Sequence, residues 1–179
     1  MDVYSHTTLT NKEMAEVLFN ISTILRAQGD QNPYRIAAYE RGARALMALP
    51  EQARDILAAQ DVVPFRPRQH IGKKLQAKIR EMARTGALDQ YARMVADLPP
   101  HIGGLMEAPG IGPRLAREIY ERLGIGTVED LVRAARDGRL RTVRGFGAKR
   151  TRAIAALDLP DARVRTATMR SLFDLPGSA

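Results

Sequence analysis

The chain of 179 residues has no cysteine and no tryptophan, and only 5% of its residues are aromatic. Without cysteine it has no disulfide, no thiolate metal site and no cysteine nucleophile. No apolar run approaches the roughly 18 residues that a membrane-spanning helix needs. The first residues show no basic segment followed by an apolar one, as a secretory leader would. We therefore expect no membrane partner and a cytoplasmic location, associated with the nucleoid if the source is bacterial.

The composition favours helices. Hydrophobic residues make up 45% of the chain, which is enough for a core built mainly from aliphatic side chains. Apolar residues recur at helical spacing, and no useful length of sequence alternates with a period of two. Thr10, with Glu13 three positions later, has the pattern of a capping box, and Pro33 is placed to open a second helix. The sequence predicts an all-α fold.

Basic residues are in excess. Lysine and arginine total 28 against 20 acidic residues, which gives a formal net charge of +8 and a pI near 10.3. This sign suits a polyanionic partner such as nucleic acid. Lysine is scarce, so the cluster at 73–78 stands out from the arginines elsewhere.

The most informative stretch is 105–123, LMEAPGIGPRLAREIYERL. A proline followed by two glycines that flank one apolar residue predicts a tight turn between two helices. Pro113 suits the first helical position, and the uncapped start of that helix offers free N–H groups and a partial positive charge. We interpret the hairpin as a clamp for one backbone phosphate, with these residues in contact: Gly110, Gly112, Arg114 and Arg117.

The pattern recurs along the chain. Gly145 and Gly147 repeat the spacing of Gly110 and Gly112, and a weaker copy follows His70 upstream. In that copy Gln69 and His70 stand where the other hairpin has proline and glycine, so we expect a weaker phosphate cradle there. One hairpin alone would favour a purely structural corner, whereas three copies followed by basic residues favour nucleic-acid binding. The two flanking copies add these candidates: Gly72, Lys73, Lys74, Gly145, Gly147, Lys149 and Arg150.

A family resemblance covers about residues 10–157. Asn32–Tyr39, Gly72–Leu75, Thr85–Leu88 and the two Gly-x-Gly hairpins resemble, in order and spacing, the N-terminal region of family X DNA polymerases. The resemblance implies a helical lyase-type domain at 10–98, with the degenerate hairpin, followed by a tandem helix-hairpin-helix domain at 99–160. Pro99-Pro100 marks the expected boundary, near 98–101. We expect disorder at 1–9 and a helix or tail at 161–179.

The resemblance also implies site residues. Lys78 matches the family's Schiff-base lysine, Lys74 matches a lysine that binds a 5′-phosphate, and Arg35 and Tyr39 match residues of the same pocket. Ala77 precedes Lys78, where family members carry an acid, so the proton acceptor is unassigned. No cofactor is required, but hairpin carbonyls are the family's Na⁺ or K⁺ ligands. The corresponding residues are Met106, Ala108 and Ile111, with Arg141, Val143 and Phe146 as counterparts in the third hairpin.

Three functions follow as hypotheses. The first is a sequence-nonspecific, structure-sensitive protein of DNA repair that binds gaps, nicks or 5′-phosphate ends. The second is a 5′-deoxyribose-phosphate lyase with Lys78 as nucleophile. The third is a scaffold that recruits a separate polymerase or ligase through apolar side chains near Leu172, Phe173 and Leu175. Nucleotidyl transfer by this chain is not expected, because it has no Asp-x-Asp pair to hold two Mg²⁺ ions.

Overall fold

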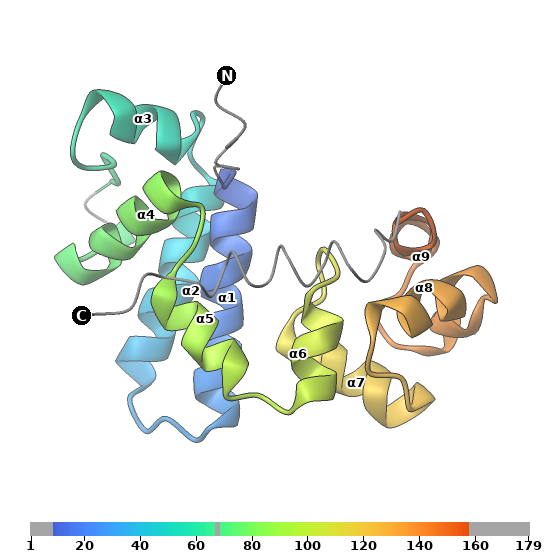
Figure 1. The fold of residues 1–179 in the computed structure, drawn as a ribbon. Helices are drawn as coiled ribbons and strands as arrows, with labels where there is room; N and C mark the ends of the chain where they lie inside the picture. Colours follow the sequence, from blue (N-terminus) through green and yellow to red (C-terminus); the bar gives the residue numbers. More distant parts are fainter. Residues whose placement is uncertain (1–8, 67–68, 158–179) are drawn as a thin grey trace, which may run out of the picture. The chain divides into compact units, whose positions relative to one another are not determined.

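The computed structural model describes residues 9–66 and 69–157, and within these ranges every regular element is helical (Figure 1). The all-α prediction is confirmed. The elements are α1 (Asn11–Ala27), α2 (Pro33–Met47), α3 (Ala53–Ala59), α4 (Lys73–Thr85), α5 (Asp89–Ala96), α6 (Pro100–Met106), α7 (Pro113–Leu123), α8 (Val128–Arg136), the 3₁₀ helix η2 (Arg139–Thr142) and α9 (Ala148–Ala155).

The predicted capping box at the start of α1 is present. The Thr10 side chain accepts a hydrogen bond from the Glu13 N–H at 3.3 Å, and the Glu13 carboxylate accepts one from the Thr10 N–H at 2.8 Å. These bonds, from the backbone first and then the hydroxyl, hold the pKa of Glu13 below its usual value of 4.5. They satisfy donors that a helix start otherwise leaves unpaired.

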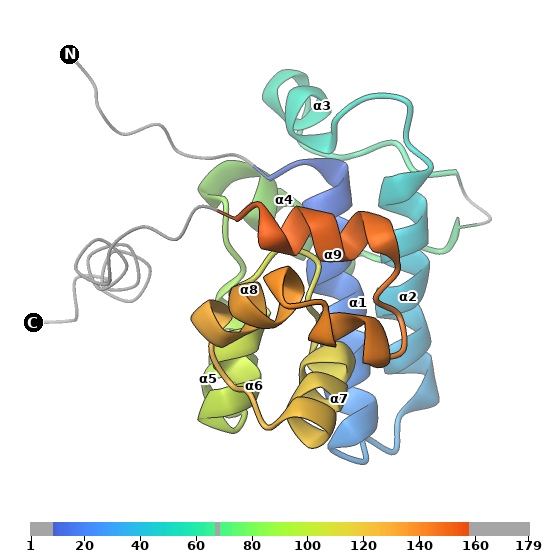
Figure 2. The ribbon, with the colours of Figure 1, turned by 90° about the vertical axis from the view of Figure 1, so that its right-hand side faces the viewer.

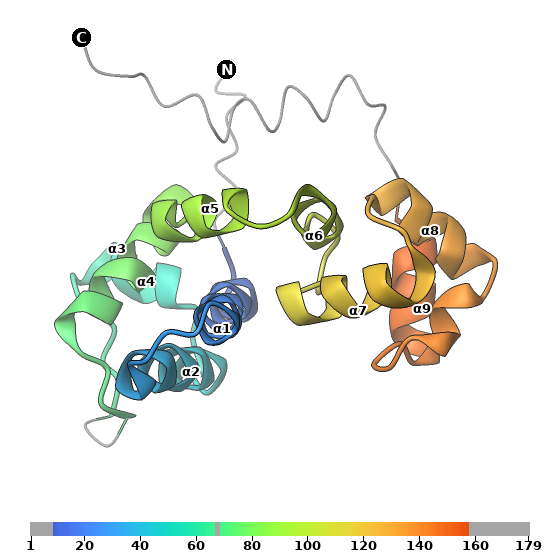
Figure 3. The same ribbon diagram turned by 90° about the horizontal axis from the view of Figure 1, so that it is seen from below.

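Helices α1 and α2 lie side by side and form the centre of the first core (Figures 1 and 3). Apolar residues from both helices pack against α3 and α4, and burial of such side chains is the main source of stability. The most deeply buried include Met14, Leu18, Ile21, Leu46, Ile79 and Met82.

A buried polar side chain joins α1 to α3. Asn11 is only 6% exposed, yet its side chain is fully engaged. Its Oδ1 accepts a hydrogen bond from the Ala53 N–H at 2.7 Å, and its Nδ2 donates to the Glu51 carbonyl at 2.8 Å. Asn11 therefore caps the start of α3 from another helix, which a search for local caps does not reveal.

The described residues divide into two compact units between Gly126 and Thr127, not at the predicted boundary of 98–101. Helices α6 and α7 pack against the first bundle, so the first compact unit extends beyond the predicted domain boundary, which itself stays a prediction. Figure 3 shows the start of α7 beside α1, and Asn20 of α1 lies against Gly112 at that point.

The second unit contains α8, η2 and α9, which pack together (Figure 2). Thr127 caps α8 by accepting a hydrogen bond from the Asp130 N–H at 3.2 Å, and Arg136 donates to the Ala155 carbonyl of α9 at 3.1 Å. The predictions for 1–8 and 161–179, including the apolar side chains near Phe173, lie outside the described residues. None of the described helices is long and apolar enough to cross a membrane.

Candidate nucleic-acid interface

All three predicted hairpins share one backbone conformation. The first position of each turn is left-handed, with φ of 49° at His70, 72° at Gly110 and 95° at Gly145. The glycine two positions later is extended in every copy, with φ between −75° and −90° and ψ between 167° and 173°. Histidine is among the few residues besides glycine that enter the left-handed region with some frequency. The His70 copy therefore keeps the turn, and the weaker phosphate cradle expected there stays a prediction.

A repeated hydrogen bond closes the second and third turns. The Ile111 N–H donates to the Ala108 carbonyl at 3.1 Å, and the Phe146 N–H donates to the Val143 carbonyl at 3.2 Å. Ile111 and Phe146 are themselves buried, at 3% and 6% exposure. Each hairpin is thus fixed from inside by one apolar side chain, which leaves the two flanking positions on the outside of the turn.

The helices that follow the turns begin without side-chain caps. Gly72, Gly112 and Gly147 are the N-caps of α4, α7 and α9, and none has a side chain to occupy the first N–H groups. By contrast, Thr10, Asn32 and Thr127 cap α1, α2 and α8. An uncapped helix start presents N–H donors and a partial positive charge, the combination that binds phosphate.

Each of these helix starts carries a basic residue at the same place. Lys74, Arg114 and Lys149 all stand two positions after the N-cap glycine, and all three are exposed. Lys73 and Arg117 are exposed as well. The three hairpins therefore join free backbone donors to a mobile positive charge in one repeated arrangement.

Arg150 contacts its own turn. Its Nη1 donates a hydrogen bond to the Gly145 carbonyl at 2.8 Å, and its guanidinium carbon lies 5.8 Å from the centre of the Phe146 ring. The side chain holds the third turn together while its remaining donors face solvent. Its role in binding phosphate, predicted from the sequence, stays a prediction.

The surroundings of the three N-cap glycines differ. A Cβ at Gly112 would lie 2.5 Å from Asn20 Oδ1, whereas a Cβ at Gly72 or Gly147 would meet no atom within 4 Å. The close neighbour of Gly112 is thus a residue of α1. Asn20 is held there because its Nδ2 donates to the Tyr91 hydroxyl at 2.9 Å. Burial raises the pKa of Tyr91, and this hydrogen bond opposes the rise.

The structure brings four predicted residues into one cavity. Arg35, Tyr39, Lys74 and Lys78 line a space of about 330 Å³, together with Asn32, Ala38 and Leu75. Arg35 forms an ion pair with Asp30 at 3.0 Å, and Tyr39 is buried, with its hydroxyl donating to Gln90 Oε1 at 3.2 Å. Tyr39 is therefore both a core residue and a wall of the cavity.

Lys73 is not part of this wall, although the sequence groups it with Lys74 and Lys78. Asn32 is a wall residue that the site prediction missed. Its Oδ1 accepts a hydrogen bond from the Arg35 N–H at 3.1 Å, which places it at the start of α2. The cap pattern of an asparagine directly before Pro33 would have located it.

The predicted cation ligands lie on the turn between α6 and α7. The Ala108 carbonyl accepts the Ile111 N–H, and a carbonyl oxygen has a second lone pair that remains for a cation. The Val143 carbonyl has the same bond in the third hairpin. Backbone carbonyls are suitable ligands for a hard cation, so the residues present fit Na⁺ or K⁺. Within the described residues no group of three or more His, Asp or Glu side chains is placed to hold a metal ion.

Comparison with known proteins gives two family matches and a curated relative. Residues 9–88 match the helix-hairpin-helix domain family, and residues 103–156 match the SAM-like helix-hairpin-helix tandem family. The chain is similar to the DNA polymerase/3′-5′ exonuclease PolX of Bacillus subtilis (strain 168), with 25% identity over 138 residues. The matched region is 77% of this chain but 23% of that polymerase. These findings confirm the resemblance indicated by the sequence and support, at a general level, a DNA-binding function.

Proposed function

We propose that this chain, a helix-hairpin-helix protein that resembles the N-terminal region of family X DNA polymerases, binds DNA at gaps, nicks or 5′-phosphate ends without reading base sequence. The observation that carries the proposal is the threefold repeat of an uncapped helix start with an exposed basic residue in the same place. Lys74, Arg114 and Lys149 are those residues. Such contacts recognise phosphate and sugar, which are common to all sequences.

The cavity around Lys78 supports the preference for 5′-phosphate ends. Lys74 and Lys78 line the cavity together with Arg35, whose guanidinium is paired with Asp30, so two lysines supply most of its positive charge. A terminal phosphate carries more negative charge than an internal one near neutral pH. Lys74 is also the basic residue of the first hairpin, so a terminal phosphate in the cavity would lie close to the start of α4.

Salt dependence of binding tests the proposal. Fluorescence anisotropy on a gapped duplex, titrated with NaCl, gives the number of phosphates from the slope of log affinity against log salt, about −0.9 per phosphate. We expect a slope for several phosphates, which becomes less steep by about one in Lys149→Gln. The control is Lys12→Gln, an exposed lysine outside the hairpins. A slope that corresponds to a single phosphate would contradict the proposal.

A second experiment tests the proposed preference for 5′-phosphate ends. Two gapped duplexes that differ only in the presence of a 5′-phosphate in the gap isolate the contribution of the cavity. We expect tighter binding to the phosphorylated duplex, and we expect Lys74→Gln to reduce this difference more than Lys73→Gln does. Equal affinity for both duplexes in the wild-type chain would remove the basis for assigning the cavity to a terminal phosphate.

A second function, 5′-deoxyribose-phosphate lyase activity, is favoured by the half-buried position of Lys78 in the same cavity. The amine would attack the C1′ aldehyde and form an imine with loss of water. Loss of a C2′ proton and cleavage of the C3′–O bond would then release the 3′-phosphate. The side chain that accepts this proton is unassigned, since Ala77 stands where the family carries an acid.

Borohydride trapping distinguishes the lyase from the binding protein. Reduction of the imine on a duplex with an abasic 5′-phosphate would give a covalent complex in the wild-type chain and in Lys73→Ala, but not in Lys78→Ala. Lys73 is the matched control because it is an exposed neighbour outside the cavity. Absence of a trapped species, or equal trapping in Lys78→Ala, would exclude this lysine as the nucleophile.

A further inference from the structure

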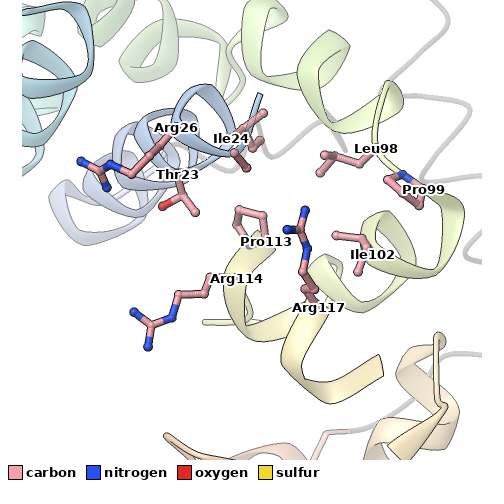
Figure 4. Close-up of a pocket in the computed structure, with 10 residues that line it drawn as sticks. Thr23, Ile24, Arg26, Leu98, Pro99, Ile102, Pro113, Arg114 and Arg117 are labelled. Carbon is pink, nitrogen blue, oxygen red and sulfur yellow. The ribbon is translucent and has the colours of Figure 1, made fainter. Parts of the chain in front are cut away.

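A second cavity, separate from the one around Lys78, lies in the first unit beside the second hairpin (Figure 4). Its volume is about 400 Å³, within the range of roughly 300–1,000 Å³ that is usual for small-molecule ligands. It is formed by the end of α1, the connection from α5 to α6, and the start of α7. The lining residues are Thr23, Ile24, Arg26, Ala27, Leu98, Pro99, Ile102, Pro113, Arg114 and Arg117.

The walls combine apolar surfaces with positive charge. Ile24, Ile102 and Pro113 are buried residues that contribute apolar atoms, and none of the lining residues is acidic. Figure 4 shows the guanidinium of Arg117 extending between Pro113 and Ile102, whereas Arg114 points away from the centre. Arg26 is paired with Glu40 at 2.7 Å, so the positive charge comes mainly from Arg114 and Arg117. This charge favours an anionic occupant, and the apolar walls favour one with an apolar face.

The cavity is continuous with the phosphate-binding turn. Pro113 is both a wall of the cavity and the first residue of α7, directly after the N-cap Gly112. Arg114, the basic residue of this hairpin, also lines the cavity. A strand with one phosphate at the start of α7 would therefore carry the adjacent nucleotide to the mouth of the cavity.

We propose that this cavity takes one unpaired nucleotide, with its base between the apolar walls and its phosphate beside Arg114 and Arg117. The proposal rests on the proposed DNA binding and adds the class of DNA end that is recognised. A base that is stacked and paired within a duplex cannot enter a recess in the protein, so the base must already be outside the stack. The unstacking penalty is smallest for a base that is already single-stranded. The preferred ligand is therefore a nick or gap with an unpaired nucleotide.

Two duplexes test the proposal with the full chain. One is nicked and fully paired, and the other has one additional unpaired 2-aminopurine nucleotide at the nick. Burial of the base against the apolar walls should strengthen binding by about 1 kcal/mol, so we expect the wild-type chain to bind the second duplex roughly fivefold more tightly. We also expect 2-aminopurine fluorescence to rise when the base leaves its stacked neighbours.

Ala27→Trp fills the cavity without removing charge, because Ala27 is an exposed residue at the end of α1 that lines it. We expect this variant to lose the gain from the unpaired nucleotide and to bind the paired nick unchanged. Ala58→Trp, an exposed alanine of α3 outside the cavity, is the matched control. Arg117→Gln should reduce the same gain, with Arg122→Gln on the same helix as its control.

The outcomes separate this proposal from the more general one. Normal binding of the paired nick with no gain from the unpaired nucleotide overturns the cavity assignment only. Loss of all duplex binding overturns the proposed function instead. An unchanged gain in Ala27→Trp also overturns the assignment. A competition experiment gives a further test. If an acidic, leucine-containing peptide displaces the unpaired base at concentrations that leave the paired nick bound, the cavity belongs to a protein partner and the assignment is overturned.

Discussion

Equivalent glycines in the second and third hairpins should respond in opposite ways to alanine. Gly112 and Gly147 both begin a helix with an extended backbone that alanine adopts without strain. A Cβ at Gly112 would lie 2.5 Å from Asn20 Oδ1, so the side chain must move and its hydrogen bond to the Tyr91 hydroxyl would break. Loss of a bond to a buried partner costs about 1–3 kcal/mol. Alanine also stabilises the fold by about 0.4–1 kcal/mol, because it lowers the conformational entropy of the unfolded chain.

We therefore expect Gly112→Ala to lower the free energy of unfolding by about 1 kcal/mol, or roughly 2–4 °C in melting temperature. Gly147→Ala meets no atom within 4 Å and should raise it by about 0.4–1 kcal/mol. Urea unfolding followed by circular dichroism measures both. In Asn20→Ala, where no Oδ1 remains, Gly112→Ala should instead raise the free energy of unfolding by about 0.4–1 kcal/mol, which gives a coupling energy of about 1.4–2 kcal/mol.

We expect reduced DNA affinity in Gly147→Ala, the variant with the more stable fold. If the start of α9 holds a phosphate, the added methyl group of Gly147→Ala weakens binding although the fold is more stable. Equal losses of stability in Gly112→Ala and Gly147→Ala would refute the contact with Asn20. Unchanged DNA affinity in Gly147→Ala would refute the use of that helix start.

Three further predictions concern stability. Asn11→Ala leaves the start of α3 without its cap and should cost about 1–3 kcal/mol in urea unfolding, whereas Lys12→Ala, an exposed neighbour, should change little. His70→Val should cost about 1–2 kcal/mol because a β-branched residue is strained at positive φ, while His70→Gly is tolerated; melting temperatures of both variants decide this. The lowered pKa of Glu13 stabilises the fold above pH 4.5, and this contribution is lost as pH falls through the folded-state pKa. Thr10→Ala should flatten the stability profile in that acidic window, and an unchanged profile would contradict the linkage.

The helices were predictable because their signals are local. The cap at Thr10 and the proline at position 33 mark starts that the structure places at Asn11 and Pro33, as expected from the backbone requirements of a helix start. The repeated turn was predictable for the same reason, since a glycine at positive φ is a local requirement. The grouping of Arg35 with Lys78 was different, because it came from the family resemblance rather than from any spacing.

The features that the sequence did not reveal depend on contacts between distant segments. The division between Gly126 and Thr127 follows from the packing of α7 on α1, and the composition of the sequence does not change at this point. The sequence did not identify Asn20 as the partner of Gly112, because a polar residue within a helix is ordinarily predicted to face solvent. The cavity around Ile102 and Pro113 needs three separate segments and has no signature in any one of them.

The three turns therefore have the same backbone conformation, but the side chains around them differ. These side chains determine which ligands each turn can bind. At Gly112 the space beside the helix start is taken by Asn20, so in the proposed complex a phosphate would reach that turn from the side of Arg114 and the neighbouring cavity. At Gly147 nothing stands within 4 Å of an added Cβ, and Lys149 is exposed. An internal phosphate needs only N–H donors and one cation, which the third turn supplies without obstruction. A strand end brings an additional charge or an unpaired base, and the first and second turns each have a cavity beside them with basic lining residues. In the proposed complex, repetition of the turn would give affinity without sequence preference, and a preference for DNA ends would come from the side chains around the first two copies.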